Sequence, residues 1–556
     1  VLGGSIAALG RSGGAPSSSA PLHAAVVMPP GADLGLTFVP LALSSDGSSL
    51  VFSTEQPERL FLRRLDAFDA VELPGTSGAF DPFFSPDDQW IGFWANGEIK
   101  KVPVHGGPPV VVATAADMLG ASWSSSDTIV FAPGFGGLIS VAATGGPASA
   151  VTTLDPARGE VHHAFPQHVN GGRSVLFTAI SRSKDAPYSV EVYELATRER
   201  RTLLHGAQYG RLLADGRLIY ARDRTLFAVK VAAETLQPVG APVPVLTDVE
   251  IGEVGAAHLS VSANGTLAYV RSQPPSDRTL QWVTKAGVAT PIDLPPRQYS
   301  NPRLSPDDGS LVVSIRDGLD TDLWSATIAG GALQRLTFGR RNQSSFSTQG
   351  FSQDGRLITY AEDVPTGARV VTQSFDGERR VQPLLQWPRR LAPTGLTAQG
   401  DVVLEEYGAN TGADILLLRR GEASPRTLVA DAGNQWGAVL SPDGRYLAYA
   451  SDETGRYEVF VVPFPGPGAK RQVTTEGGDE VRWSRDGREL FYRHGDRMMA
   501  VPMATSPWLQ PGQSRMLFAA PFTVGAAGLP AYDVASDGRF LMMRDVTPPQ
   551  PRELRL

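Results

Sequence analysis

The chain has no cysteine among its 556 residues. Disulfides, thiolate metal sites and cysteine nucleophiles are therefore excluded. The zinc-binding His-Glu-x-x-His motif and the phosphate-binding glycine loop are absent as well. No segment combines a sustained 3.6-residue hydrophobic period with capping residues, so we expect no long helix.

Acidic residues outnumber basic ones, 57 to 50. The formal net charge is −7, and no basic stripe exists that could displace counterions from phosphate, which argues against a nucleic-acid partner. The short basic clusters Arg198–Arg201 and Lys470–Arg471 are interpreted as solvated turn residues. No residue pattern calls for a cofactor.

Turn-forming residues, by contrast, are abundant along the whole length. The 59 glycines and 44 prolines are spread throughout the chain, which indicates many turns and not one disordered tail. A chain of 556 residues exceeds one ordinary hydrophobic core, so two large domains are expected.

One phrase recurs about every 40 to 51 residues. It consists of an apolar strand, a Ser/Pro-Asp-Gly turn and a second apolar strand, as in Leu440–Ser451 (LSPDGRYLAYAS). Proline presets the first turn position, the Asp side chain accepts backbone hydrogen bonds, and Gly takes the positive-φ position. We therefore assign a structural and not a catalytic role to the turn residues Asp46, Gly47, Asp87, Asp215, Gly216, Asp307, Asp354, Gly355, Asp443, Gly444, Asp486, Gly487, Asp537 and Gly538.

A third and a fourth strand follow most of these turns, separated by Gly-Gly or Asp-Gly, as in Ile99–Thr114. Four strands per unit are typical of a propeller blade. Counting degenerate copies, the sequence holds twelve units. Because one ring usually has 4–8 blades, we predict an all-β fold of two tandem β-propellers with about six four-stranded blades each, over residues 23–275 and 276–556.

Closing each ring requires strands from both ends of a domain, because an unpaired blade leaves an exposed edge. The last unit keeps only the segment Arg552–Leu556 after its second strand and lacks a fourth strand of its own. A strand near the domain join, such as Thr290–Leu294, is expected to complete it. The early segment Ala24–Met28 is expected to complete the first ring.

Four longer segments resemble the extracytoplasmic region of bacterial receptor-type serine/threonine kinases: Ser441–Gly478, Trp483–Met503, Phe80–Pro109 and Gly216–Val231. In that family a cytoplasmic kinase domain precedes one membrane helix and then TolB-like, WD-40-like propellers. The resemblance extends from about Ala24 onward and implies an extracytoplasmic chain, periplasmic or at the cell surface, anchored to the inner membrane.

The N-terminal residues 1–22 fit this scheme in part. Val1–Gly10 is apolar but far shorter than the ~20 residues of a membrane span, and Arg11–Ala20 reads as a flexible linker. The segment is interpreted either as the remnant of a membrane helix or as a frayed N-terminus. The resemblance favours the first interpretation, and any membrane contact would come only through this segment.

Kinase chemistry itself is not encoded here. Phosphoryl transfer needs a glycine-rich phosphate loop, an ATP-positioning lysine and His-Arg-Asp and Asp-Phe-Gly elements, and none occurs in the chain. The segment is therefore predicted not to be an enzyme, and a kinase domain is expected upstream in the parent chain.

Three histidines stand close together as weak metal or catalytic candidates: His162, His163 and His168. Imidazoles that converge on a propeller channel can ligate a metal or act as a base. However, their spacing matches no metal motif, and adjacent strand residues point to opposite faces. We expect a structural or hydrogen-bonding role and assign no metal site.

An acidic group and the strand tryptophans are further candidates. Asp317, Asp320 and Asp322 lack the residue order of a calcium loop and are predicted to form a solvated hairpin. The strand tryptophans are expected mainly to pack between blades, while any that lie on a propeller face would be binding anchors: Trp90, Trp94, Trp123, Trp282, Trp324, Trp436 and Trp483.

The preferred hypothesis is a non-catalytic sensor that binds a protein or small-molecule ligand on one propeller face. Two alternatives stay open. One is a free periplasmic scaffold of the TolB type. The other is a propeller lyase or hydrolase that uses His162, His163 and channel carboxylates, since such sites assemble from distant loops.

Overall fold

The computed structural model describes residues 24–547 and 554–556, apart from short gaps at 27, 30–31, 33, 36–38, 56–57, 116, 135, 182–186, 253–254, 274–275, 318–319, 339–349, 365–366, 376–377, 410–411, 432, 455, 467, 506–507 and 526–529. The expectations for residues 1–22 lie outside this part. The described chain contains strands, turns and two short 3-10 helices, η1 (Pro156–Arg158) and η2 (Asn170–Gly172). None of its helices could span a bilayer.

The strands of the described residues pair into twelve antiparallel sheets. Six of them, called here the first ring, are built as follows: β2 (Leu41–Leu43), β3 (Ser49–Glu55), β4 (Glu58–Arg64) and β5 (Val71–Glu72); β6 (Ala79–Phe84), β7 (Trp90–Ala95), β8 (Glu98–Pro103) and β9 (Val110–Thr114); β10 (Met118–Trp123), β11 (Thr128–Pro133), β12 (Ile139–Ala142) and β13 (Ser149–Ala150); β14 (Glu160–Val169), β15 (Ser174–Ser181), β16 (Tyr188–Glu194) and β17 (Arg200–His205); β18 (Gln208–Leu212), β19 (Arg217–Arg222), β20 (Thr225–Val231) and β21 (Pro238–Leu246); β22 (Leu259–Val261), β23 (Leu267–Val270), β49 (Leu554–Arg555) and β1 (Ala25–Val26).

The other six sheets, called the second ring, are these: β26 (Gln298–Leu304), β27 (Ser310–Asp317), β28 (Asp320–Thr327) and β29 (Gln334–Arg335); β30 (Gly350–Phe351), β31 (Leu357–Val364), β32 (Gly367–Ser374) and β33 (Val381–Trp387); β34 (Arg390–Leu396), β35 (Val402–Ala409), β36 (Gly412–Leu418) and β37 (Arg426–Val429); β38 (Gln435–Leu440), β39 (Tyr446–Ser451), β40 (Glu458–Pro463) and β41 (Arg471–Gln472); β42 (Asp479–Trp483), β43 (Glu489–His494), β44 (Arg497–Ala504) and β45 (Gln510–Pro511), with β46 (Arg515–Ala519) beside β44; β47 (Tyr532–Val534), β48 (Phe540–Asp545), β24 (Arg278–Val283) and β25 (Ala289–Pro291).

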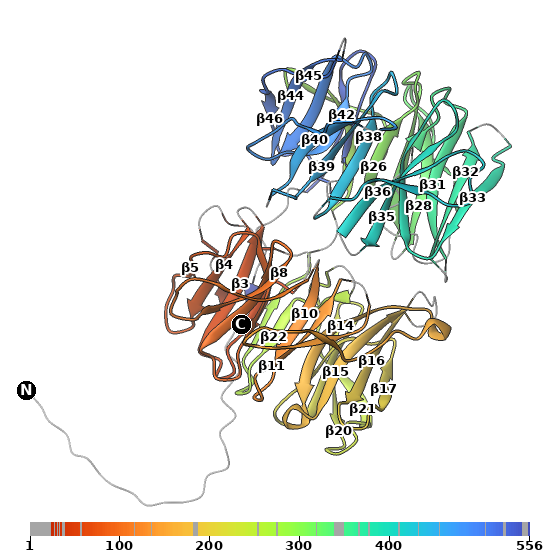
Figure 1. Cartoon of the computed structure of the whole chain (residues 1–556). Helices are drawn as coiled ribbons and strands as arrows, with labels where there is room; N and C mark the ends of the chain where they lie inside the picture. Colours follow the sequence, from red (N-terminus) through yellow and green to blue (C-terminus); the bar gives the residue numbers. More distant parts are fainter. Residues whose placement is uncertain are drawn as a thin grey trace, which may run out of the picture.

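Neighbouring sheets touch mainly through their first strands, called here the inner strands, and these contacts trace two circuits. In the second ring, β26 contacts β30 on one side and β47 on the other. In the first ring, the hydroxyl of Tyr209 on β18 donates to the carbonyl of Leu259 on β22. Figure 1 shows the two sets as separate bodies, red to yellow-green and green to blue. The prediction of an all-β propeller fold from four-stranded antiparallel units is confirmed.

Hydrophobic residues of facing sheets fill the space between the blades. Val51 and Leu60 of the first sheet, for example, lie in one buried cluster with Ile91 and Phe93 of the second. All four side chains are fully buried. Every sheet in a ring has two neighbours, so apolar residues are buried on both faces of the sheet.

The Ser-x-Asp-Gly turns join the first and second strands of their sheets. At the β38–β39 turn, the Ser441 hydroxyl donates to Asp443 Oδ1 at 2.6 Å and accepts from the amide of Tyr446 at 3.0 Å. Asp443 Oδ1 also accepts from the amide of Arg445, and Gly444 has a φ of 68°. The serine therefore has a structural role that sequence reasoning had left unassigned.

Two turns carry a second aspartate at the position that glycine occupies in turns such as Asp443–Gly444. Asp88 and Asp308 adopt positive φ angles of 56° and 57°, a conformation that Asp tolerates better than most residues. Each carboxylate accepts a hydrogen bond at 2.8 Å from a backbone amide of the neighbouring blade's turn, that of Ser45 and that of Ser536 respectively. These residues therefore tie adjacent turns together as well as reversing the chain.

The sheet that closes the second ring combines both ends of that part of the chain. Strand β48 pairs with β24 over six residues, and β25 is added outside β24. The predicted closing segment Thr290–Leu294 overlaps the outer strand β25. The prediction missed β24, since the last unit lacks two strands and not one.

The sheet that closes the first ring departs further from expectation. Strand β1 is present within the predicted segment Ala24–Met28, but it does not pair with β23. The C-terminal strand β49 lies between them, with Leu554 opposite both Val26 and Val270. The chain end is consequently drawn beside the first ring in Figure 1, although Arg552–Leu556 was assigned to the second domain.

Shortening Leu554 should destabilise the first ring selectively. This side chain is fully buried, so we expect Leu554→Ala to lower the free energy of unfolding by about 2–5 kcal/mol. Hydrogen exchange should show lost protection in β1, β22 and β23 and unchanged protection in β26 and β27. Val546→Ala, at an exposed position directly after β48, is the control. Equal loss of protection in both rings would contradict this closure.

The turn aspartates should make stability depend on acidity. Hydrogen bonds from Ser352 and the Arg356 amide lower the pKa of Asp354 below its usual 3.8, and Asp46, Asp87, Asp307 and Asp486 are lowered in the same way. A lowered folded-state pKa gives stability that is present above about pH 4 and is lost as pH falls through the folded-state value. Urea unfolding of wild type and Asp354→Asn between pH 6 and pH 3 should show their difference shrinking below pH 4. A difference that grows on acidification would show that the sign is wrong.

Candidate functional site

The three candidate histidines all lie on β14, but the structure does not bring their rings together. His163 is completely buried, whereas His162 and His168 are partly exposed. Two irregularities interrupt the pairing of β14 with β15, between Glu160 and His162 and between Ala164 and Gln167. These bulges turn the strand so that each imidazole meets different neighbours.

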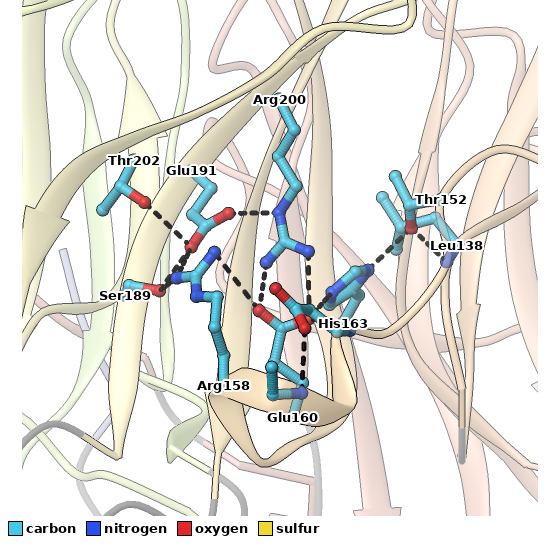
Figure 2. Close-up of polar contacts among 11 residues, drawn as sticks. Leu138, Thr152, Arg158, Glu160, His163, Ser189, Glu191, Arg200 and Thr202 are labelled. Atoms are coloured by element: carbon cyan, nitrogen blue, oxygen red, sulfur yellow. Dashed lines mark hydrogen bonds and ion pairs between the residues drawn. The ribbon is translucent and has the colours of Figure 1, made fainter.

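A directed chain of hydrogen bonds holds His163 (Figure 2). The amide of Leu138 donates to Thr152 Oγ1 at 2.8 Å, which leaves the threonine hydroxyl proton for His163 Nδ1, 2.7 Å away. His163 Nε2 lies 3.1 Å from Glu160 Oε2. Because an ionised carboxylate only accepts, Nε2 carries the proton and Nδ1 accepts. The ring is therefore a neutral imidazole of one tautomer.

The pKa values of the pair agree with this assignment. Burial lowers the pKa of His163 even though Glu160 opposes the shift. Burial by itself would raise the pKa of Glu160, but the hydrogen bonds from His163 and Arg200 outweigh it and hold the value at about 2. Neutral His163 and ionised Glu160 are thus the expected states at neutral pH.

Arg200 joins Glu160 to a second buried carboxylate, Glu191 (Figure 2). Its guanidinium bonds both carboxylates, and Arg158 reaches Glu191 from η1. The Glu160 and Glu191 side chains are 1% and 0% exposed. Ser189 and Thr202 donate further hydrogen bonds to Glu191. Every acceptor in the group is engaged, so the network braces β14, β16 and β17.

The other two histidines make separate contacts. His168 donates its backbone amide to Ser122 Oγ on β10 at 3.0 Å, and its Nδ1 lies 3.2 Å from the same oxygen. Burial lowers its pKa. His162 sits opposite Ile180 and forms an isolated bridge with Gly136. Within the described residues, no three His, Asp or Glu side chains are placed to hold one metal ion.

The acidic hairpin differs from its prediction at one position. Asp317 and Asp320 pair at the end of β27 and β28, and Asp317 is exposed. Asp322 is instead buried and bonds Arg335 and the Thr337 hydroxyl. The prediction of a solvated residue is wrong there, because Arg335 on β29 supplies a partner that the local sequence does not reveal.

The tryptophans mostly pack as expected. Trp94 and Trp483 are buried and donate their indole N–H to the carbonyls of Ala115 and Val439. Other rings stack under cations: Lys101 lies 4.8 Å from Trp90 and 5.3 Å from Trp123. The most exposed tryptophan of the described chain, Trp508, is 61% exposed and was not among the predicted anchors.

Sequence reasoning missed a set of buried carboxylates beside the inner strands. Asp81, at a bulge in β6 with a φ of 52°, accepts from the amides of Val39 at 2.6 Å and Gly120 at 2.9 Å, and so bridges the sheets on both sides of its own. Burial raises its pKa well above the usual value. The positive φ follows from the bulge, and only long-range contacts reveal it.

Two glutamates also accept backbone amides in the second ring. Glu480 has a φ of 50° and accepts from the amides of Gly525 at 2.9 Å and Ala531 at 2.7 Å. Glu405 accepts from the Ala438 amide at 2.9 Å, and burial raises its pKa to about 7. These carboxyl groups pair backbone donors, two of which, the amides of Gly120 and Ala438, lie at strand irregularities.

No protein-family model and no curated protein matches the chain. Among solved structures, a TolB protein from Agrobacterium tumefaciens is 17% identical over 49% of this chain and 100% of its own, with a TM-score of 0.39. Oligogalacturonate lyase from Vibrio parahaemolyticus is 13% identical over 64% of this chain and 94% of its own, with a TM-score of 0.33. The tricorn protease is 11% identical over 86% of this chain and 58% of its own, with a TM-score of 0.32.

At these identities and scores the likeness carries no information about activity. The strand pairing itself establishes that the chain has a β-propeller fold.

Removing Arg200, the cation that Glu160 and Glu191 share, should destabilise the folded protein. Arg200→Met leaves Glu160 and Glu191 without their common partner, and we expect the free energy of unfolding to fall by about 3–5 kcal/mol. Arg380→Met is the matched control, since Arg380 and Glu378 are 78% and 64% exposed and such pairs contribute about 0–1 kcal/mol. Chemical unfolding at neutral pH measures both. Equal effects would show that the network does not brace the sheet.

Proposed function

We propose that the chain is a non-catalytic recognition module, the ligand-sensing ectodomain of a membrane-anchored bacterial serine/threonine kinase. The support for the kinase context is the resemblance of Phe80–Pro109, Gly216–Val231, Ser441–Gly478 and Trp483–Met503 to that family. The ligand would be a protein or a small molecule docked on one face of a ring.

The observation that carries the recognition role is that two buried carboxylates, Asp81 and Glu480, and the buried His163 are engaged by other groups of the protein. Asp81 and Glu480 each use both carboxylate oxygens to accept backbone amides, and His163 accepts at one nitrogen and donates at the other. A general acid or base needs a lone pair or proton that can reach the substrate. These residues instead stiffen the ring walls, as a binding scaffold requires.

The way the chain ends meet suggests how a signal would leave the module. Strand β1, directly after the predicted linker, pairs with β49, and β49 arrives from the second ring. A ligand that favours one arrangement of the rings would act on this strand pair, and thereby on the N-terminal segment that precedes residue 24. Such a ligand shifts the equilibrium only by its difference in affinity for the two arrangements.

Fractionation of cells that produce the parent protein tests this proposal. We expect the chain in the membrane fraction, digested by protease added to spheroplasts, and encoded downstream of kinase motifs and a membrane span. Release in the soluble periplasmic fraction would select the TolB-type scaffold instead. Protection from external protease would overturn both.

A further inference from the structure

The second ring carries a set of equivalent positions at its centre, the penultimate residue of each inner strand. In each sheet this residue pairs one step inside the last pair before the turn, as Arg303 does with Val312. Around the ring the six positions are Arg303, Gly350, Gly395, Val439, Arg482 and Asp533.

The charges gather on one side of this level. Strand β47 contacts both β42 and β26, so Asp533 stands between Arg482 and Arg303. The remaining three positions are Gly350, Gly395 and Val439. A methyl group added at Gly350 would meet only the Thr394 carbonyl, at 3.9 Å. The level therefore has a charged half, and its other half is made of small residues.

The two arginines have more hydrogen-bond donors than the described residues accept. Arg303 is 8% exposed and Arg482 is 7% exposed. Arg303 Nη1 donates to the carbonyls of Pro302 at 2.7 Å and Pro530 at 3.1 Å, with that of Tyr532 at 3.5 Å. The buried Nε of Arg482 has no hydrogen-bond acceptor in the described chain. Each guanidinium offers five N–H groups, and most of them have no acceptor among the described residues.

The neighbouring carboxylates cannot make up this shortfall. Asp533 already accepts the amides of Leu304 at 2.8 Å and Val534 at 2.9 Å, and its Oδ1 is 3.8 Å from Arg482 Nε. Glu480 is committed to Gly525 and Ala531. Burial, together with the charge of Arg482, lowers the pKa of Arg303 to about 9, which fits positive charge that is incompletely balanced.

We infer that Arg482 and Arg303 form a binding site for a ligand that carries a carboxylate group. A carboxylate has two coplanar oxygens that match the paired N–H groups of a guanidinium, and it would supply the acceptors and the negative charge that this level lacks. On the opposite side of this level, Gly350 and Gly395 carry no side chain. The inference rests on the proposed recognition role and names its ligand chemistry.

Titration of the whole chain with sodium succinate, in sodium chloride of matched ionic strength, tests the site by calorimetry. We expect saturable binding in the millimolar range. Arg482→Gln should weaken it by about tenfold or more, because hydrogen bonds to charged groups are lost. Arg488→Gln, at an 85% exposed arginine of the following turn, should leave it unchanged. Absence of saturable binding, or equal loss in both variants, would overturn the inference.

Tetra-alanine with a free or an amidated C-terminus separates two sources of the carboxylate. Binding of the free peptide, but not of the amide, points to a protein C-terminus, and binding of succinate alone points to a small molecule. Both support the site.

Arginine modification of the wild type by phenylglyoxal, followed by mass spectrometry, covers the case in which Arg482→Gln fails to fold. Succinate should protect Arg482 and Arg303 but not Arg488, and equal modification with and without succinate would contradict the site. Failure of the spheroplast experiment would leave these outcomes untouched, so the two proposals fail separately.

Discussion

Both rings depend on strand pairs formed between distant parts of the chain. β48 pairs with β24 across 267 residues at Arg278 and Asp545, and β49 is inserted between β1 and β23. Without these pairs each ring would be an open stack with an unpaired edge, which invites aggregation. The remaining blades can form their hairpins locally, but only the closing sheets fix the circle.

The local part of this architecture could be predicted from the sequence. Each hairpin carries its own turn chemistry, as at Ser441, Asp443 and Gly444, and neighbouring residues form every bond of that turn. The insertion of β49 could not be predicted, because Leu554–Arg555 has no turn signal and only two residues pair. Its partners are set by burial of Leu554 against the first ring.

The candidate site divides along the same line. The sequence indicated a hydrogen-bonding role for His163, and the bulged strand around it provides that role. Its network could not be read from the sequence, since Arg200 lies 40 residues from Glu160 and comes into reach only through pairing of the intervening strands. The same holds for Arg303 and Arg482, whose equivalence appears only once the registers of β26 and β42 are known.

Polar groups in this molecule therefore serve two ends. Carboxylates such as Asp81 and Glu405 accept hydrogen bonds from backbone donors of neighbouring blades and make the walls rigid. The guanidinium of Arg482 is also buried, but its Nε has no acceptor among the described residues. A rigid ring with one under-satisfied charged level is suited to holding a ligand in a fixed position.

The central claim is that β49 closes the first ring beside β1, and a disulfide tests it most directly because the chain has no other cysteine. Ala25 and Arg555 face each other between backbone hydrogen bonds of their neighbours Ala24 and Leu556, and such non-hydrogen-bonded pairs have the short Cα separation that a disulfide needs. The double variant Ala25→Cys and Arg555→Cys should cross-link under mild oxidation within one molecule, seen as a two-proton mass loss, and should unfold at a higher temperature than its reduced form. Two free thiols in a folded monomer after oxidation would contradict the account.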